Sequence, residues 1–237
     1  MYAPGTTSVL RTITQGVKLP CDVAVDHSGN VYVANGSANT VTVYGSRKTK
    51  LKQTISNGIS EPGALAFDNA GNVYVANYAS STVTVYASGT STLLLTISQG
   101  IGNPGELVFD GSGNLYVGND NFSTVTVYAP GSSSVLRTIS EDVDVPYALA
   151  FDSSGNLYVA NYNAATVTVY APGSGLVLRT ISQKVQFPGS LAFDASGSLY
   201  VGNSDNSTVT VYASGKKMVK RTISAGVSFS HALGFGP

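Results

Sequence analysis

The sequence has few charged residues, one cysteine and no long apolar run. Each of these shortages argues against a particular kind of structure or partner. Charged residues make up 11% of the 237 residues and the formal net charge is zero, whereas an average globular chain is about 25% charged. Nothing in this net balance indicates a nucleic-acid partner, so we expect none. The single Cys21 excludes an internal disulfide. No apolar run approaches the roughly 18 residues of a membrane helix, so we expect no membrane span.

The common catalytic and metal-binding motifs are missing as well. The sequence contains no phosphate loop, no Cys/His metal spacing, no nucleophile elbow and no pattern of a catalytic triad. It therefore predicts no cofactor and no bound metal, and it favours a non-enzymatic role.

What the sequence does contain is a repeat of 42 residues that no insertion or deletion interrupts. The string Thr-Val-Thr-Val-Tyr begins at Thr40 and returns with that period at Thr82, Thr124, Thr166 and Thr208. The dipeptides Thr-Ile and Tyr-Val return with the same period. Such a period indicates a fold built by stacking one small supersecondary unit.

Each unit contains four short strand-like segments that are separated by turns. In the fourth unit these segments are 148–151, 156–160, 166–170 and 177–181, called A, B, C and D below. They are rich in Val, Tyr, Thr, Ile and Leu and are bounded by Gly, Pro, Asn and Asp. Four strands in a period of this length predict a blade of a β-propeller. The fold class is therefore all-β, with four-stranded antiparallel blades.

The chain holds five full units and part of a sixth. Six segments are of type A, the last at 232–235, and six are of type D, the first at 9–13, but only five are of types B and C. We expect residues 1–237 to form a single propeller domain that closes like a six-bladed ring. An incomplete closing blade would expose strand edges, which favour pairing with another chain. Homo-oligomers formed through this blade therefore remain an alternative.

One part of the unit points to known families. The string FDSSGNLYVAN at 151–161, followed by TVTVY at 166–170, resembles the NHL repeat and the YVTN-type surface propeller repeat, and the resemblance covers nearly the whole chain. NHL rings are usually six-bladed and YVTN rings often seven-bladed. These families include scaffolds, cell-surface modules and a few lactonase- or lyase-like enzymes. The low-charge, Thr/Ser/Asn-rich composition favours an extracellular, cell-surface or periplasmic location.

Residues that depart from the repeat are the candidates for function, because the repeated residues build the blades. A blade zigzags outward, so its D–A and B–C loops share one side, here called the loop face. Every tyrosine outside the repeated positions maps to this face, and so does every acid outside the A–B turns. Phe187 is interpreted as packing beneath its loop. The predicted ligand-binding residues are Tyr78, Tyr147, Tyr162, Phe122, Asp120, Asp205, Glu106 and His231.

The leading interpretation is a non-catalytic binding module or scaffold with a protein or carbohydrate ligand. Aromatic rings supply apolar area, while Asn and Asp supply directed hydrogen bonds to a glycan or a peptide. The asparagine that ends segment B is read as architectural, bonding to loop backbone in every unit. It stands at Asn35, Asn77, Asn119, Asn161 and Asn203.

Two alternatives stay open. Asp22, Glu106 and His231 stand at the start of A segments and could converge on a central channel as a metal site or an acid–base pair, as in lactonase- or lyase-like propellers. The other alternative is a structural, self-assembling surface propeller. Most basic residues of the first and fifth units lie in C–D turns and D segments, away from the acidic loop face, and opposite charges favour docking between copies.

Overall fold

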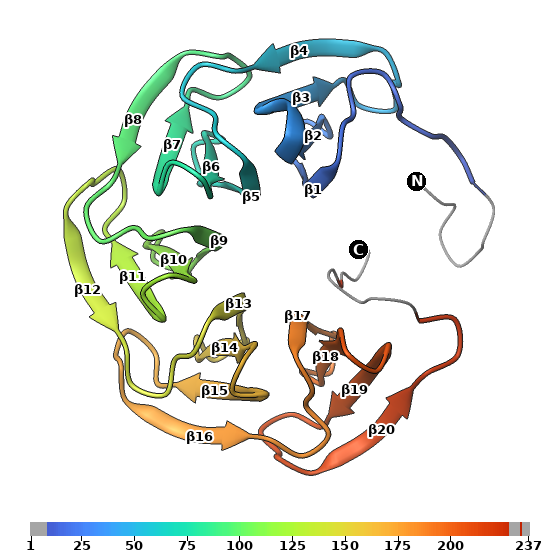
Figure 1. The fold of residues 1–237 in the computed structure, drawn as a ribbon, viewed down its shortest axis with the longest axis vertical. Coiled ribbons are helices and arrows are strands. Elements are labelled where there is room, and N and C mark those ends of the chain that lie inside the picture. The colour runs from blue at the N-terminus through green and yellow to red at the C-terminus, as the bar shows by residue number, and fades with distance from the viewer. Residues whose placement is uncertain (1–8, 228–232, 234–237) are drawn as a thin grey trace. The chain divides into compact units, whose positions relative to one another are not determined.

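The computed structural model describes residues 9–227 and residue 233, and the strands in this range form five four-stranded antiparallel sheets (Figure 1). One short 3-10 turn, Gly36–Ala38, is the one helical element of the described chain. No helix in this range is long and apolar enough to span a membrane. The chain divides after Leu107 into two compact units.

Each sheet consists of four strands that are consecutive in the sequence. The first contains β1 (Pro20–Val25), β2 (Val31–Asn35), β3 (Thr40–Tyr44) and β4 (Leu51–Ile55). The second contains β5 (Pro62–Phe67), β6 (Val73–Asn77), β7 (Thr82–Tyr86) and β8 (Leu93–Ile97). The third contains β9 (Pro104–Phe109), β10 (Leu115–Asn119), β11 (Thr124–Tyr128) and β12 (Val135–Ile139).

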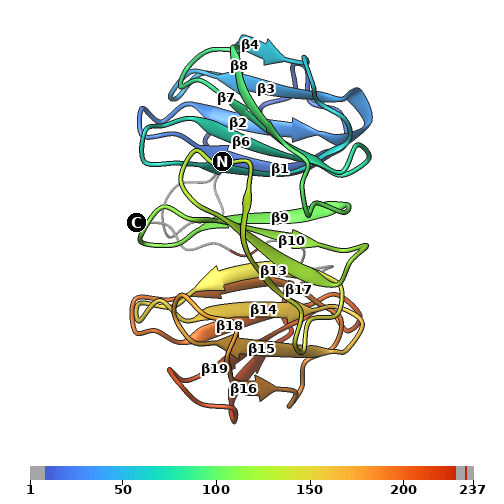
Figure 2. The ribbon, with the colours of Figure 1, turned by 90° about the vertical axis from the view of Figure 1, so that its left-hand side faces the viewer.

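The last two sheets have the same strand order and lie within the second compact unit, which begins at Val108. One contains β13 (Pro146–Phe151), β14 (Leu157–Asn161), β15 (Thr166–Tyr170) and β16 (Val177–Ile181), which follow one another across the blade in Figure 2. The other contains β17 (Pro188–Phe193), β18 (Leu199–Asn203), β19 (Thr208–Tyr212) and β20 (Val219–Ile223). The predicted blades of four antiparallel strands are thus confirmed, one for each full repeat.

The predicted C and D strands match the structure, whereas strands A and B are shifted. Strand A starts at Pro146 rather than at residue 148, because Pro146 pairs with Asn161 and a β-bulge separates it from Ala148. Strand B starts at Leu157 rather than at residue 156, because Asn156 belongs to the preceding turn. There the Asp152 carboxylate accepts the Asn156 N–H at 3.0 Å and its side-chain amide at 2.7 Å.

The partial sixth unit is only partly described. The expected strand at 9–13 is wrong: Val9 forms an isolated bridge, and residues 10–14 have no regular structure. In each full unit strand D pairs with strand C of the same unit, as β16 does with β15, and the sequence has no C segment for this D segment. The expected strand at 232–235 lies outside the described residues, apart from residue 233, which is not in a strand.

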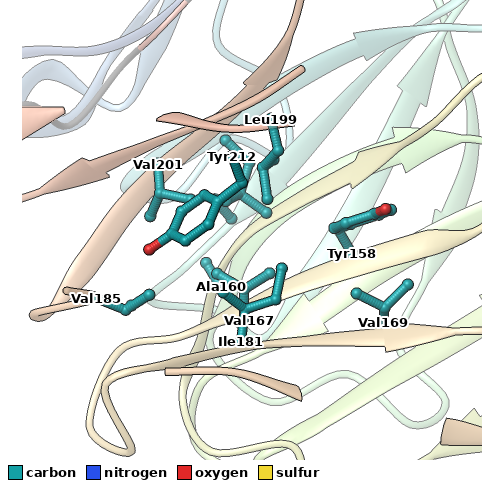
Figure 3. Packing of buried hydrophobic residues seen from close by; sticks show 11 residues of the cluster. Tyr158, Ala160, Val167, Val169, Ile181, Val185, Leu199, Val201 and Tyr212 are labelled. Atoms are coloured by element: carbon teal, nitrogen blue, oxygen red, sulfur yellow. The ribbon is translucent and has the colours of Figure 1, made fainter. Parts of the chain in front are cut away.

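Apolar side chains of neighbouring blades interlock to form the core. Figure 3 shows Ala160, Val167 and Ile181 of one blade facing Leu199 and Val201 of the next. The ring of Tyr158 contacts Phe193 edge-on, with centroids 4.9 Å apart. The strand residues that recur in every unit are thus buried in the core, and the loops are the parts that can vary.

Candidate functional site

In the first, second, fourth and fifth blades the D–A and B–C loops are hydrogen-bonded to one another. The backbone N–H of Tyr162 donates to the Val145 carbonyl at 3.0 Å, and that of Ser204 donates to Phe187 at 3.1 Å. In the second blade Tyr78 donates in the same way to the Glu61 carbonyl at 3.1 Å. The two loop types therefore lie together, and the loop face is a physical surface of each blade.

The asparagine that ends strand B holds these loops in place. Asn161 is fully buried, and its side-chain amide donates to Thr166 and Thr168 of β15, with N–O distances of 3.1 and 2.9 Å. It also donates to the Asp142 carbonyl at 3.0 Å, while its oxygen accepts the Asp144 N–H at 3.1 Å. Its architectural interpretation fits this geometry, because the bonds join strand C to the D–A loop. The other asparagines of this set are also fully buried: Asn35, Asn77, Asn119 and Asn203.

Strand A begins with a proline, and the residue after this proline occupies a β-bulge. That residue lies close to the first residue of the B–C loop. In the first blade these residues are Cys21 and Gly36, and a Cβ on Gly36 would lie 2.7 Å from the Cys21 sulfur. The equivalent position to Cys21 is Gly63 in the second blade and Gly189 in the fifth. One member of each of these three pairs is thus a glycine.

In the fourth blade neither residue of this pair is a glycine, and both are tyrosines, Tyr147 and Tyr162. Their ring centroids are 5.1 Å apart at an interplanar angle of 32°. Tyr162 also contacts Phe187 of the next blade, with centroids 5.1 Å apart at 57°. Tyr147 is 38% exposed and Phe187 39% exposed, and Tyr162 is half-buried between them. These three residues are called the aromatic cluster below.

Phe187 corrects the sequence interpretation, because its ring is exposed in the aromatic cluster instead of packing beneath its loop. Its backbone is left-handed, with φ at 44°, a conformation that is unfavourable for a bulky side chain. The sequence carries only a weak signal for it, since the equivalent residues Leu19, Glu61 and Val145 share the conformation but not the ring.

The loops that carry the aromatic cluster also contain acidic residues. Asp144 is tied to Asn161, the residue before Tyr162, and Asp205 follows Ser204, whose N–H binds Phe187. Asp142 and Lys184 adopt φ values of 53° and 55° at a position where other units have glycine, namely Gly16, Gly58 and Gly100. The sequence places both Asp144 and Asp205 on the loop face, but only Asp205 is among its predicted ligand-binding residues.

The preceding B–C loop adds two more predicted residues, Asp120 and Phe122. Phe122 is 52% exposed. The neighbouring Ser123 hydroxyl accepts the Val145 N–H at 3.2 Å, which joins this loop to the D–A loop of the fourth blade. One carboxylate oxygen of Asp120 is buried without a hydrogen-bond partner, and burial raises the pKa of Asp120 to about 6. A buried acceptor of this kind is available to a ligand or to water.

In the compact unit that ends at Leu107, the structure brings Asp22 of β1 and Glu106 of β9 into electrostatic contact. Burial, and secondly the charge of Asp22, raise the pKa of Glu106 to about 8. Burial also raises the pKa of Asp22. The Asp22 carboxylate accepts the N–H of Leu65 in β5 at 2.7 Å and that of Val23 at 2.7 Å. Asp22 therefore links β1 to β5, and its charge disfavours ionisation of the nearby Glu106.

The remaining predicted residues are separate from these groups or undescribed. Tyr78 is 39% exposed on the loop face of the second blade, where the Asn103 side chain donates to its carbonyl at 3.1 Å. His231 lies outside the described residues. Within residues 9–227 and residue 233, no three His, Cys, Asp or Glu side chains gather as metal ligands would.

Comparison with known proteins supports the fold. No protein-family model matches the chain, and no curated protein does. Among solved structures, a chain from a crystal structure of the mitotic checkpoint complex is similar, with a TM-score of 0.76 and 15% sequence identity. The match covers 90% of this chain and 67% of that chain. With the five repeated sheets, this likeness shows that the chain has a β-propeller fold.

Proposed function

We propose that this protein is a non-catalytic binding propeller whose ligand, a glycan or a peptide, binds on the loop face. The observation that carries the proposal is the exposed aromatic cluster of Tyr147, Tyr162 and Phe187. An extracellular, cell-surface or periplasmic location and membership of the NHL or YVTN repeat families are parts of the same proposal.

The chemistry of the cluster suits recognition. Aromatic rings give large apolar contact area, and each loses little conformational entropy on binding because few torsions must be fixed. Tyr147 and Phe187 are both more than a third exposed. Because the fourth blade places two tyrosines where the first, second and fifth blades have a glycine in the pair, packing alone does not account for them.

The test is the double variant Tyr78→Ala plus Tyr162→Ala, screened on glycan arrays and peptide arrays beside the wild type. We expect ligand binding to weaken about tenfold or more, as removal of central aromatic contacts does at other interfaces. Leu94→Ala is a matched control, because it removes an exposed apolar side chain from the outer strand β8. Unchanged binding by the double variant would contradict the proposal.

A second candidate is catalysis at Asp22 and Glu106, which the raised pKa of Glu106 favours. A carboxyl group that titrates near neutral pH can donate and accept protons in general acid–base chemistry. Elemental analysis of protein purified without chelators separates the two candidates. One equivalent of a tightly bound divalent metal would favour a lactonase- or lyase-like enzyme over the binding module.

A third candidate is self-assembly through the outer strands. The last strand of each sheet, such as β12 or β16, pairs within its sheet with only one neighbour. These strands expose Leu136 and Leu178, at 57% and 48%. Light scattering coupled to size exclusion at low and high salt tests this candidate, because docking driven by charge weakens as salt rises.

A further inference from the structure

We propose that the aromatic cluster binds the cationic side chain of a basic polypeptide segment, a lysine or an arginine. The inference rests on the proposed loop-face binding function and names the class of its ligand. It follows from the arrangement of the three rings, from the charges beside them and from their exposure.

The three rings face in different directions and form a partly exposed corner. Tyr147 and Tyr162 are tilted by 32°, and Tyr162 and Phe187 by 57°. A cation within about 6 Å of a ring centroid is attracted by the negative ring face. A group placed in this corner can meet more than one ring, whereas the flat face of a sugar ring can stack on only one of them.

The loops that carry the cluster contain mostly negative charges. The D–A loop before Tyr147 contains Glu141, Asp142 and Asp144, and Asp205 follows Ser204, whose N–H donates to the Phe187 carbonyl. The one base in the D–A and B–C loops of the fourth and fifth blades is Lys184. This excess of acid complements a positive ligand and gives no advantage to a neutral glycan.

The same chain pairs cations with tyrosine rings elsewhere. The guanidinium carbon of Arg179 lies 5.5 Å from the ring centroid of Tyr158, and that of Arg221 lies 5.9 Å from Tyr200. Each arginine belongs to the same blade as the tyrosine that it contacts. The aromatic cluster offers the same kind of ring surface on the loop face, with acids beside it.

The exposure of the cluster indicates that the cation belongs to a large partner. Tyr147 and Phe187 are 38% and 39% exposed, so the corner is shallow. Sites for free small molecules enclose about 70–90% of the ligand surface. A shallow corner suits a side chain whose position is fixed by further contacts along a polypeptide, for example with the exposed Phe122.

The experiment uses fluorescein-labelled Gly/Ser peptides of about twelve residues with spaced lysines or arginines, in low-salt buffer where charge screening is weak. Matched peptides carry glutamine or glutamate in place of the basic residues. Fluorescence anisotropy measures binding to the full chain. We expect the lysine and arginine peptides to bind, and the glutamine and glutamate peptides to bind at least about tenfold more weakly.

Variants assign the binding to the cluster. Tyr162→Leu keeps apolar area but removes the ring, and should weaken binding of the basic peptides by about tenfold, whereas Tyr162→Phe should retain it. Asp144→Asn with Asp205→Asn should weaken it several-fold. Glu61→Gln is the control, because it removes one exposed negative charge from the D–A loop that leads into the second blade. Urea unfolding of each variant confirms that it is folded.

The outcomes separate this inference from the proposed function. Equal binding of glutamine and lysine peptides, or full binding by Tyr162→Leu, would overturn the inference. Binding of a neutral glycan that depends on Tyr162, with no binding of basic peptides, would overturn it too while supporting the loop-face function. If neither peptides nor glycans bind, both proposals are wrong.

Discussion

Replacing Asn161 with alanine should destabilise the fold strongly, although the residue lies next to a loop. Its amide donates to Thr166, Thr168 and the Asp142 carbonyl, and its oxygen accepts the Asp144 N–H. Each lost hydrogen bond removes about 0.5–1.5 kcal/mol, and a buried polar group left without a partner costs about 1–3 kcal/mol. Because these contacts overlap, we expect a loss of about 3–5 kcal/mol in the free energy of unfolding.

Urea unfolding followed by far-UV circular dichroism measures this loss as a lower midpoint at unchanged slope. Asn163→Ala is the matched control. Asn163 is exposed two residues further along the same loop, so its replacement should change stability by less than about 0.5 kcal/mol. A loss below about 1 kcal/mol for Asn161→Ala would refute the claim that this asparagine holds the D–A loop to strand C.

Three further predictions follow from the geometry. Glu106 stays protonated in the fold up to about pH 8, whereas in the unfolded chain it ionises near pH 4.5. The free energy of unfolding should therefore fall by on the order of 5 kcal/mol between these pH values, and Glu106→Gln should flatten that fall. Lys184→Gly should raise the free energy of unfolding by about 1 kcal/mol, because φ there is 55°. Asp152→Ala should lower it by about 2–3 kcal/mol, because its carboxylate accepts the N–H groups of Ser154 and Asn156.

The sequence predicts the blade well wherever one periodicity governs a segment. Strand C is predicted to the residue, since its alternating Thr and Val face opposite sides of the sheet. Strand A is predicted two residues late, because the bulge after Pro146 breaks the period-two pattern. The same bulge positions Tyr147 on the loop face, so the least predictable part of the strand is the part that forms the candidate site.

The candidate site is predictable in composition but not in assembly. Subtracting the repeat identifies Tyr147, Tyr162 and Asp205 as departures from the pattern. It does not show that Phe187 completes the cluster, because that contact joins two blades and depends on a left-handed backbone. It also does not separate Tyr78, whose partner position is Gly63, from the stacked pair. Contacts between repeats are set by packing geometry, which the pattern within one repeat does not encode.

The central claim is that residues departing from the repeat form the binding surface of the loop face. Hydrogen–deuterium exchange of the full chain, with and without the bound lysine peptide, tests it most directly. The account predicts slower exchange in the loops at 142–147, 162–165 and 184–187, with no change in the A–B turns at 152–156 and 194–198. Protection confined to those turns or to the outer strands β16 and β20 would contradict it.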